Sequence, residues 1–195
     1  NTSVYNDSLL TCTATATDDD DGTLAVTYEW SIGSDVYTGA SLDLSTTAAL
    51  PTDSILCTAS ATDSAVAIAV DTNSVTIENR SPSLSTLVFD PNSSVTTDSL
   101  VECSVIVTDA DGEALTPTYT WSNNGTTLGS AATVQLDNTI VQPNDTLECQ
   151  ASVTDNYGET DTLSGTVTIA NSDPIVESIV IAPSPLNRLD TLVCT

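Results

Sequence analysis

The side chains of this sequence that could do chemistry are mostly carboxylates, and many of them gather in two short runs. Residues 18–22 read Asp-Asp-Asp-Asp-Gly, and residues 109–113 read Asp-Ala-Asp-Gly-Glu. Carboxylates at this density, beside a glycine that permits a sharp turn, are typical of loops that bind Ca²⁺. The alternative is a solvated acidic turn in which the Asp side chains accept hydrogen bonds from their own backbone. The sequence leaves both interpretations open.

Composition gives little support to catalytic chemistry. The chain contains no His and no Lys, so a Ser-His-Asp triad, a His general base and a Lys–Asn isopeptide crosslink are excluded. A carboxylate pair could in principle hydrolyse a glycoside. However, two aromatic-poor domains with one Trp each offer little surface for a sugar. We therefore expect no enzymatic activity.

The charge balance restricts the partners. There are 27 acidic residues against two basic ones, Arg80 and Arg188, which gives a formal net charge of −25. Such a chain repels nucleic acid and anionic membranes and attracts cations. Its sequence contains no apolar run long enough to insert into a membrane. The charge favours an extracellular or salty setting, where counterions screen the repulsion.

Two copies of one pattern organise the chain. Trp30 follows Cys12, and Trp121 follows Cys103, in each case after 18 residues; a second Cys, Cys57 or Cys149, completes each copy. The repeat is about 92 residues long, and Pro82 to Pro91 matches Pro174 to Pro183. This spacing predicts a domain over 1–79 that lacks its first strand, a complete domain over 80–171, and the start of a third domain over 172–195.

Cys194 repeats Cys103 after 91 residues. We expect its partner to lie outside this segment, so the chain reads as a piece of a longer array. Repeat-locked cysteines are typical of oxidised, exported proteins. Linkers between the predicted domains are very short, without a flexible Gly/Ser tract, which predicts a semi-rigid, end-to-end arrangement.

The local pattern predicts strands throughout. Val, Ile, Thr, Leu and Ala alternate with a period of two, and Gly, Pro, Asn and Asp interrupt them. We therefore predict an all-β protein of tandem antiparallel sandwiches. In the complete domain the strands are expected near 84–90, 99–108, 117–123, 132–136, 146–154 and 161–169.

The order Cys, Trp, Cys fits an immunoglobulin-type sandwich, in which a disulfide joins the two sheets and a Trp packs against it. The whole chain resembles the Ig-like (PKD- or cadherin-like) tandem repeats of large bacterial and archaeal surface proteins. The resemblance is carried by Asp-Ser-Leu-Val-Glu-Cys103, Thr-Asp-Ala-Asp-Gly112, Tyr-Thr-Trp121 and Asp-Thr-Leu-Glu-Cys149. It implies one inter-sheet disulfide per domain, Cys12–Cys57 and Cys103–Cys149, with Trp30 and Trp121 in the cores. PKD domains proper lack this disulfide pattern, and the tyrosine-corner position holds Ile55 and Leu147.

Alternation also places carboxylates at one pole of each domain. An Asp stands six residues after each Cys, on the same face of the strand, so Asp18 should meet Asp63, and Asp109 should meet Asp155. In an Ig-type domain the N-terminal linker reaches the same pole, and Asp7 and Asp53 of the preceding domain face the gap. We therefore predict a cadherin-like Ca²⁺ clamp that stiffens the junction. Its predicted ligands are Asp18, Asp20, Asp63, Asp109, Asp111, Asp155, Glu78 and Asn79.

The expected role is structural. Such repeats resemble stalks, adhesins and fibre subunits, so the predicted partners are neighbouring copies, joined in one chain or by strand exchange. The alternative is a module that binds a surface glycan or protein receptor through the loops at the acidic pole. A third reading is an accessory region of a secreted hydrolase. Candidate glycosylation sites are Asn6, Asn92, Asn124 and Asn144.

Overall fold

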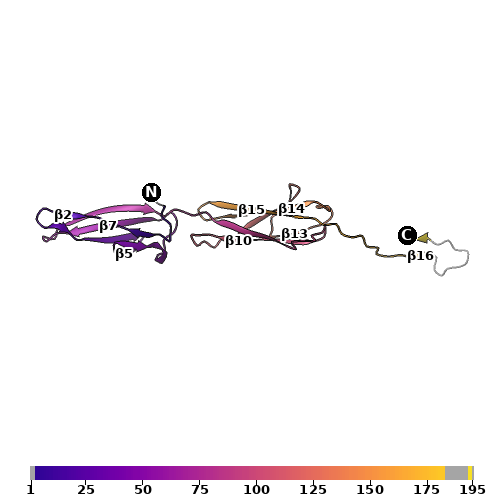
Figure 1. The fold of residues 1–195 in the computed structure, drawn as a ribbon, viewed down its shortest axis with the longest axis horizontal. Helices are drawn as coiled ribbons and strands as arrows, with labels where there is room; N and C mark the ends of the chain where they lie inside the picture. The colour runs from indigo at the N-terminus through magenta and orange to yellow at the C-terminus, as the bar shows by residue number, and fades with distance from the viewer. Residues whose placement is uncertain (1–2, 183–192, 195) are drawn as a thin grey trace.

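The computed structural model describes residues 3–182 and 193–194. Apart from one 3-10 turn, η1 (Leu44–Thr46), all regular structure in these residues is β. Figure 1 shows an elongated molecule in which the strands of the first repeat (residues 3–78) and those of the second repeat (residues 82–170) follow one another along the long axis. The prediction of an all-β fold built from antiparallel sheets is confirmed.

The second repeat contains two antiparallel sheets. One has the order β13-β10-β9 and the other the order β12-β11-β14-β15. Their strands are β9 (Ser83–Asp90), β10 (Leu100–Thr108), β11 (Thr118–Asn123), β12 (Thr126–Gly129), β13 (Thr133–Gln135), β14 (Thr146–Thr154) and β15 (Thr160–Thr168). The predicted Cys103–Cys149 disulfide is present and joins β10 of one sheet to β14 of the other.

The first repeat has a similar four-stranded sheet but a less regular second layer. The four-stranded sheet has the order β5-β4-β7-β8, and the remaining strands form the pairs β1-β6 and β2-β3. The strands are β1 (Leu9–Thr11), β2 (Ala16–Asp18), β3 (Gly22–Leu24), β4 (Val26–Ile32), β5 (Asp35–Thr38), β6 (Ser41–Asp43), β7 (Ser54–Thr62) and β8 (Ile68–Thr76). The predicted Cys12–Cys57 disulfide is also present.

Each repeat has its own hydrophobic core around its disulfide and its Trp. Trp30 and Trp121 are buried, and each indole N–H donates a hydrogen bond to a backbone oxygen, Gly39 O at 2.8 Å and Ala131 O at 2.9 Å. A buried indole N–H without a partner would cost free energy. The alternation works as expected in β10, where Val101 and Cys103 are buried between exposed neighbours. The sequence pattern therefore located both cores.

One predicted strand differs from the structure. The alternating run from Cys12 to Asp18 was expected to be continuous, like β10, but residues 12–15 lie outside any strand. β10 pairs with β9 along most of its length, whereas no strand among the described residues of the first repeat takes the place of β9. A backbone without a partner strand has no ladder to hold it, so the strand divides into β1 and β2.

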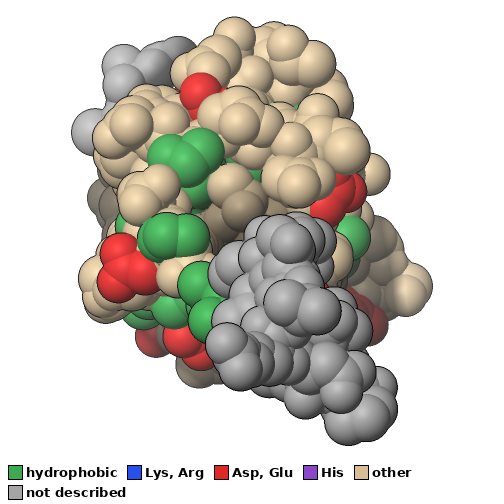
Figure 2. All heavy atoms as spheres, turned by 90° about the vertical axis from the view of Figure 1, so that its right-hand side faces the viewer, with side chains coloured by type: hydrophobic (Ala, Val, Ile, Leu, Met, Phe, Trp, Pro, Cys, Tyr) green, Lys and Arg blue, Asp and Glu red, His purple; other side chains and the backbone are tan. Residues whose placement is uncertain are grey.

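Beyond the second repeat the chain continues in extended form. β16 (Ile181–Ala182) pairs with β17 (Val193–Cys194) at this end of the molecule. Figure 2 shows the molecule from this end, where acidic and hydrophobic side chains lie among other side chains and backbone. The expectation about the partner of Cys194 concerns a side chain outside the described part of the structure. In the described residues there is no helix of the length and hydrophobicity needed to span a membrane.

Candidate functional site

The junction between the repeats is a short segment that is fastened to the first repeat. Ile77 is 1% exposed. Its N–H donates to Asp53 O at 3.0 Å, and its carbonyl accepts from Thr52 N at 2.9 Å. Glu78 N donates to Val4 O at 2.7 Å. These backbone hydrogen bonds hold the segment against Val4 and the Thr52–Asp53 turn of the first repeat. The position of residues 79 and 80, which lead into the second repeat, is therefore fixed relative to the first.

Arg80 connects this segment to the acidic loop that follows β10. Its Nε donates to Asp111 Oδ1 at 2.9 Å, its backbone N–H donates to Asp111 Oδ2 at 2.7 Å, and its Nη2 donates to Ala110 O at 2.7 Å. The side chain of Asp111 is fully buried in this arrangement. A buried carboxylate is tolerated when it is paired and hydrogen-bonded, and Arg80 satisfies both requirements.

The same guanidinium also binds the first repeat. Nη1 of Arg80 lies 2.9 Å from Asp7 Oδ2, and Nη2 donates to Asn6 Oδ1 at 2.8 Å. The guanidinium carbon lies 4.8 Å from the centre of the Tyr5 ring, a cation–π distance. Asn6 Nδ2 completes the contact by donating to Asp111 O at 2.8 Å. Arg80 therefore joins both repeats through five hydrogen bonds to four residues and through a contact with an aromatic ring.

The charge of Arg80 is secured by its surroundings. Burial lowers its pKa, but the hydrogen bonds and negative charges of Asp7 and Asp111 outweigh this effect and raise the pKa above its ordinary value. Arg80 thus stays protonated at every relevant pH.

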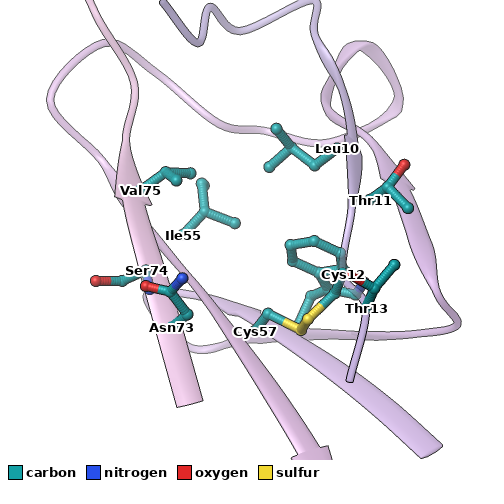
Figure 3. Close-up of a pocket in the computed structure, with 10 residues that line it drawn as sticks. Leu10, Thr11, Cys12, Thr13, Ile55, Cys57, Asn73, Ser74 and Val75 are labelled. Atoms are coloured by element: carbon teal, nitrogen blue, oxygen red, sulfur yellow. A yellow bond between two sulfur atoms is a disulfide. The ribbon is translucent and has the colours of Figure 1, made fainter. Parts of the chain in front are cut away.

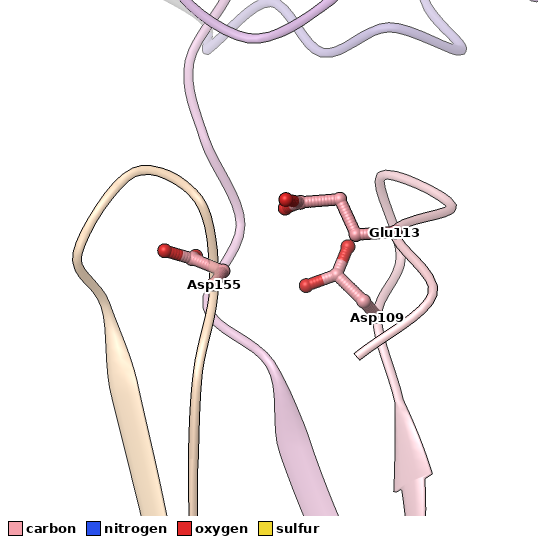
Figure 4. Close-up of side chains that lie close together, drawn as sticks. All are labelled: Asp109, Glu113 and Asp155. Atoms are coloured by element: carbon pink, nitrogen blue, oxygen red, sulfur yellow. The ribbon is translucent and has the colours of Figure 1, made fainter. Parts of the chain in front are cut away.

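A second group of carboxylates lies beside Arg80 at the same junction. Asp109 and Glu113 come from the loop after β10, and Asp155 comes from the loop after β14. One oxygen of each lies within 4.8 Å of the others. Figure 4 shows the Asp109 and Glu113 side chains extending from one loop toward Asp155 on the other. Three carboxylates so close together repel one another unless a cation or hydrogen-bond donors compensate them.

Hydrogen bonds compensate Asp155. Its Oδ1 accepts from the backbone N–H groups of Tyr157 and Glu159, and its Oδ2 accepts from Asn79 Nδ2 at 2.8 Å. Burial raises the pKa of Asp155, but the bonds from Asn79 and from the backbone outweigh it and leave the pKa below its usual value. The carboxylates of the junction also affect Tyr157. Burial raises the pKa of Tyr157, and the negative charges of Glu113, Asp53, Asp111 and Asp155 raise it further.

Three oxygen atoms around this group are buried but lack hydrogen-bond partners in the described chain. They are Asn79 Oδ1, Asp109 Oδ2 and Glu113 Oε2. Buried oxygens without partners are rare and call for an explanation. Together with Asp155 they form a set of hard oxygen ligands from three chain segments, which is the ligand type that Ca²⁺ takes. Water would have to complete the usual six to eight positions.

The predicted junction ligands divide into two groups. Asp109 and Asp155 meet as expected, and Asn79 contacts Asp155. Asp111 instead serves the ion pair with Arg80, and Glu78 is exposed and outside the carboxylate group. Glu113 and Arg80 also take part in the junction but are not among the predicted ligands. Their signals were present, since Glu113 closes the second acidic run and Arg80 is a rare cation between two repeats.

The acidic pole of the first repeat looks different. Asp18 Oδ1 accepts from the backbone N–H groups of Asp20 and Asp21, and Asp63 Oδ1 accepts from Ala67 N at 2.7 Å. Asp21 joins the two loops by accepting from Ser64 N at 2.8 Å. Within the described residues, Asp18, Asp20 and Asp63 do not form a group with metal-ligand spacing. Here the observed contacts match the alternative reading, an acidic turn that caps its own backbone.

The candidate glycosylation sites also differ in their surroundings. Asn6 uses its Nδ2, the atom that would carry a glycan, to bond Asp111 O at the junction. Asn92, Asn124 and Asn144 are exposed, although Asn124 Nδ2 also donates a hydrogen bond, to Asp145 Oδ1 at 2.9 Å. Occupancy remains a prediction for these three, while a glycan at Asn6 would replace a junction contact.

Comparison with known proteins gives no family for this chain. No family model matches the sequence, and no curated protein matches it either.

Proposed function

We propose that this chain is a structural repeat segment of an extracellular surface protein or filament, made of disulfide-crossed Ig-like domains that stand end to end. The junction is the observation that carries this proposal. Arg80 makes side-chain bonds to Asn6 and Asp7 on one side and to Asp111 on the other. A flexible linker would need no such contacts, so they favour a protein whose function depends on fixed domain spacing.

The disulfides and the net charge support an extracellular location. Both disulfides indicate an oxidising environment. The charge of −25 with only two basic residues favours the outside of a cell, where salt screens the repulsion. We place the protein at the cell surface or in an extracellular fibre.

We also propose that Ca²⁺ binds at the junction, through Asp109, Glu113, Asp155 and the amide oxygen of Asn79. The three buried oxygens without partners support this assignment over a plain acidic turn. A bound Ca²⁺ would neutralise the carboxylates and tie the linker residue Asn79 to both loops of the second repeat. The effect would be a stiffer junction.

Calorimetric titration of the full chain with Ca²⁺ tests this part. We expect saturable binding and a melting temperature that rises with Ca²⁺ and falls again with EGTA. Asp109→Asn and Glu113→Gln should abolish the rise. Asp71→Asn is the matched control, because Asp71 lies on exposed β8 and, within the described residues, its carboxylate bonds only the adjacent backbone N–H. Equal Ca²⁺ responses in all variants would exclude this site.

Small-angle X-ray scattering of the full chain tests the spacing function. We expect an elongated particle whose maximum dimension varies little between Ca²⁺ and EGTA in the native sequence. Arg80→Ala in EGTA should give a broader distribution of distances, because neither the Arg80 contacts nor a bound Ca²⁺ then holds the two repeats together. A native chain that already scatters as two freely moving domains would refute the proposal.

The alternative is a module that binds glycan or protein through the loops at the acidic pole. In the second repeat those loops already contact Asn79 and Arg80. The loops of the first repeat, around Asp18 and Asp63, have no such cover in the described structure. A glycan array would detect binding there, and Asp20→Ala in the first repeat should weaken it.

A further inference from the structure

The loop after β10, which supplies two of the proposed Ca²⁺ ligands, is held in place by hydrogen bonds from nearby backbone groups. Asp109 Oδ1 accepts from the backbone N–H of Asp111 at 2.7 Å, and Glu113 Oε1 accepts from the backbone N–H of Asn156 at 3.1 Å. The other oxygen of each carboxylate, Asp109 Oδ2 or Glu113 Oε2, is buried and lacks a partner in the described chain. Each carboxylate is thus fixed through one oxygen, which leaves the other oriented for an ion.

The first repeat holds this loop from the other side of the junction. Asn6 Nδ2 donates to Asp111 O at 2.8 Å. Asn6 Oδ1 accepts from Arg80 Nη2 at 2.8 Å, and Arg80 Nε in turn donates to Asp111 Oδ1 at 2.9 Å. Asp7 and the Tyr5 ring also contact the guanidinium. Both the backbone and the side chain of Asp111 are therefore tied to the first repeat, directly through Asn6 and indirectly through Arg80.

Asn79, the proposed ligand from the linker, is positioned by contacts on both of its sides along the chain. On the N-terminal side, Glu78 N donates to Val4 O of the first repeat at 2.7 Å. On the C-terminal side, Arg80 N donates to Asp111 Oδ2 at 2.7 Å. The amide oxygen of Asn79 is buried and has no partner within the described residues. Attachment of the linker at both ends therefore holds this oxygen at the site.

We infer that docking of the first repeat sets the Ca²⁺ affinity of the junction, with Arg80 as the positioning residue that transmits the effect. The inference deepens the proposed Ca²⁺ site and rests on it. Ligands that are already held in place lose little conformational freedom on binding, so a preorganised site binds its ion more tightly. Reciprocity requires that Ca²⁺ favours docking by the same factor by which docking favours Ca²⁺. A force that separates the two repeats would therefore also release the ion.

The positive charge of Arg80 acts on the ion in the opposite direction, so the choice of variant matters. Arg80→Ala would remove a positive charge near the site, which favours a bound cation, and would also remove the contacts that position the ligands, which disfavours it. Substitutions that keep the net charge isolate the second effect. Asn6→Ala removes two hydrogen bonds, to Arg80 Nη2 and to Asp111 O, without a change in charge. Arg80→Lys keeps the positive charge but loses the planar guanidinium.

Calorimetric titration of the full chain with Ca²⁺ measures the effect. We expect Asn6→Ala and Arg80→Lys each to raise the Kd by about fivefold or more, the lower end of typical coupling between sites. Asn73→Ala is the matched control, because Asn73 lies on exposed β8 and, within the described residues, its side chain bonds only the backbone N–H of Ser74. Figure 3 shows both residues on β8, beside the strand that carries Cys57. The control should keep a Kd within about twofold of the native value, and circular dichroism verifies that all variants fold.

Nuclear magnetic resonance tests the reciprocal effect. Arg80 and Arg188 are the only arginines of the chain, so the Nε–H signal of Arg80 can be resolved. Ca²⁺ should slow the exchange of this proton with water in the native chain, because docking holds it against Asp111 Oδ1. The slowing should be smaller in Asn6→Ala, in which the coupling is weakened.

The outcomes separate this inference from the proposed site. Native-like Kd values in both Asn6→Ala and Arg80→Lys, within about twofold, would overturn the inference and leave the Ca²⁺ site intact. An equal loss of affinity in Asn73→Ala would also overturn it, and so would an exchange rate of the Arg80 Nε–H that Ca²⁺ does not change. Absence of Ca²⁺ binding by the native chain would instead refute the proposed site itself, and the inference with it.

Discussion

The substitution Arg80→Ala should destabilise the second repeat and loosen the junction together. It removes four side-chain hydrogen bonds, to Asp111 Oδ1, Asp7 Oδ2, Asn6 Oδ1 and Ala110 O. The largest loss concerns Asp111, whose fully buried carboxylate would be left without a counter-charge.

Breaking a buried ion pair on one side costs about 3–5 kcal/mol. The Arg80 side chain is 23% exposed, so water can reach the site after the substitution. The backbone N–H of residue 80 also still donates to Asp111 Oδ2. We therefore expect the lower end of the range, about 3 kcal/mol. For a repeat of this size that lowers the melting temperature by about 10 °C or more.

Urea unfolding monitored by Trp fluorescence measures this cost. Two further variants separate the causes. Arg80→Lys keeps the positive charge but loses the planar guanidinium, and Arg80→Ala/Asp111→Asn removes the unpaired carboxylate. We expect Arg80→Lys to lose less stability than Arg80→Ala, and the double variant to recover part of the loss. A cost for Arg80→Ala below about 0.5 kcal/mol would place it in the range of exposed surface pairs and refute the reasoning. A double variant no more stable than Arg80→Ala would refute the account of Asp111.

Three further predictions follow from named contacts. The pKa of Asp155 is lowered in the folded state, so the stability that its carboxylate contributes is present above the unfolded pKa near 3.9 and is lost as the pH falls through the folded pKa. In Asp155→Asn the free energy of unfolding should therefore depend less on pH below about pH 4, as followed by circular dichroism. Gly165→Ala should cost about 1 kcal/mol in urea, because the new Cβ would press on the Leu87 and Phe89 side chains of β9 and the end of Leu87 must shift aside, whereas Gly129→Ala, with open space around it, should cost little. Replacing Cys103 and Cys149 by Ala removes a crosslink over 46 residues and should cost about 4 kcal/mol, measured by the same unfolding curves.

The strands, the disulfides and the cores could be predicted because their signals are local and repeated. Alternation with a period of two selects the buried face of a strand, and matched Cys and Trp positions mark both cores. The missing prediction was β12 (Thr126–Gly129), which follows the Asn124-Gly125 turn. Its residues show little alternation of hydrophobicity, because the strand lies at a sheet edge next to β11.

The carboxylates illustrate the limit of that reasoning. Six-residue spacing from each Cys correctly placed Asp109 near Asp155, because strands of one direction end at one pole. The same spacing placed Asp18 and Asp63 at the corresponding pole of the first repeat, yet they bond their own loops there. Spacing fixes which end of a strand a residue occupies; the neighbouring loop decides what that residue contacts.

The sequence by itself determined the all-β architecture, the two crosslinks and the presence of acidic loops, since each depends on periodicity or on pairs of matched positions. Only the tertiary structure decided the use of Arg80, because its partners Asp111 and Asp7 lie 31 and 73 residues away along the chain. Once Arg80 pairs with Asp111, the remaining carboxylates Asp109, Glu113 and Asp155 stand as a separate group with unpartnered oxygens. That division of charge depends on distances between loops, which no pattern along the chain records.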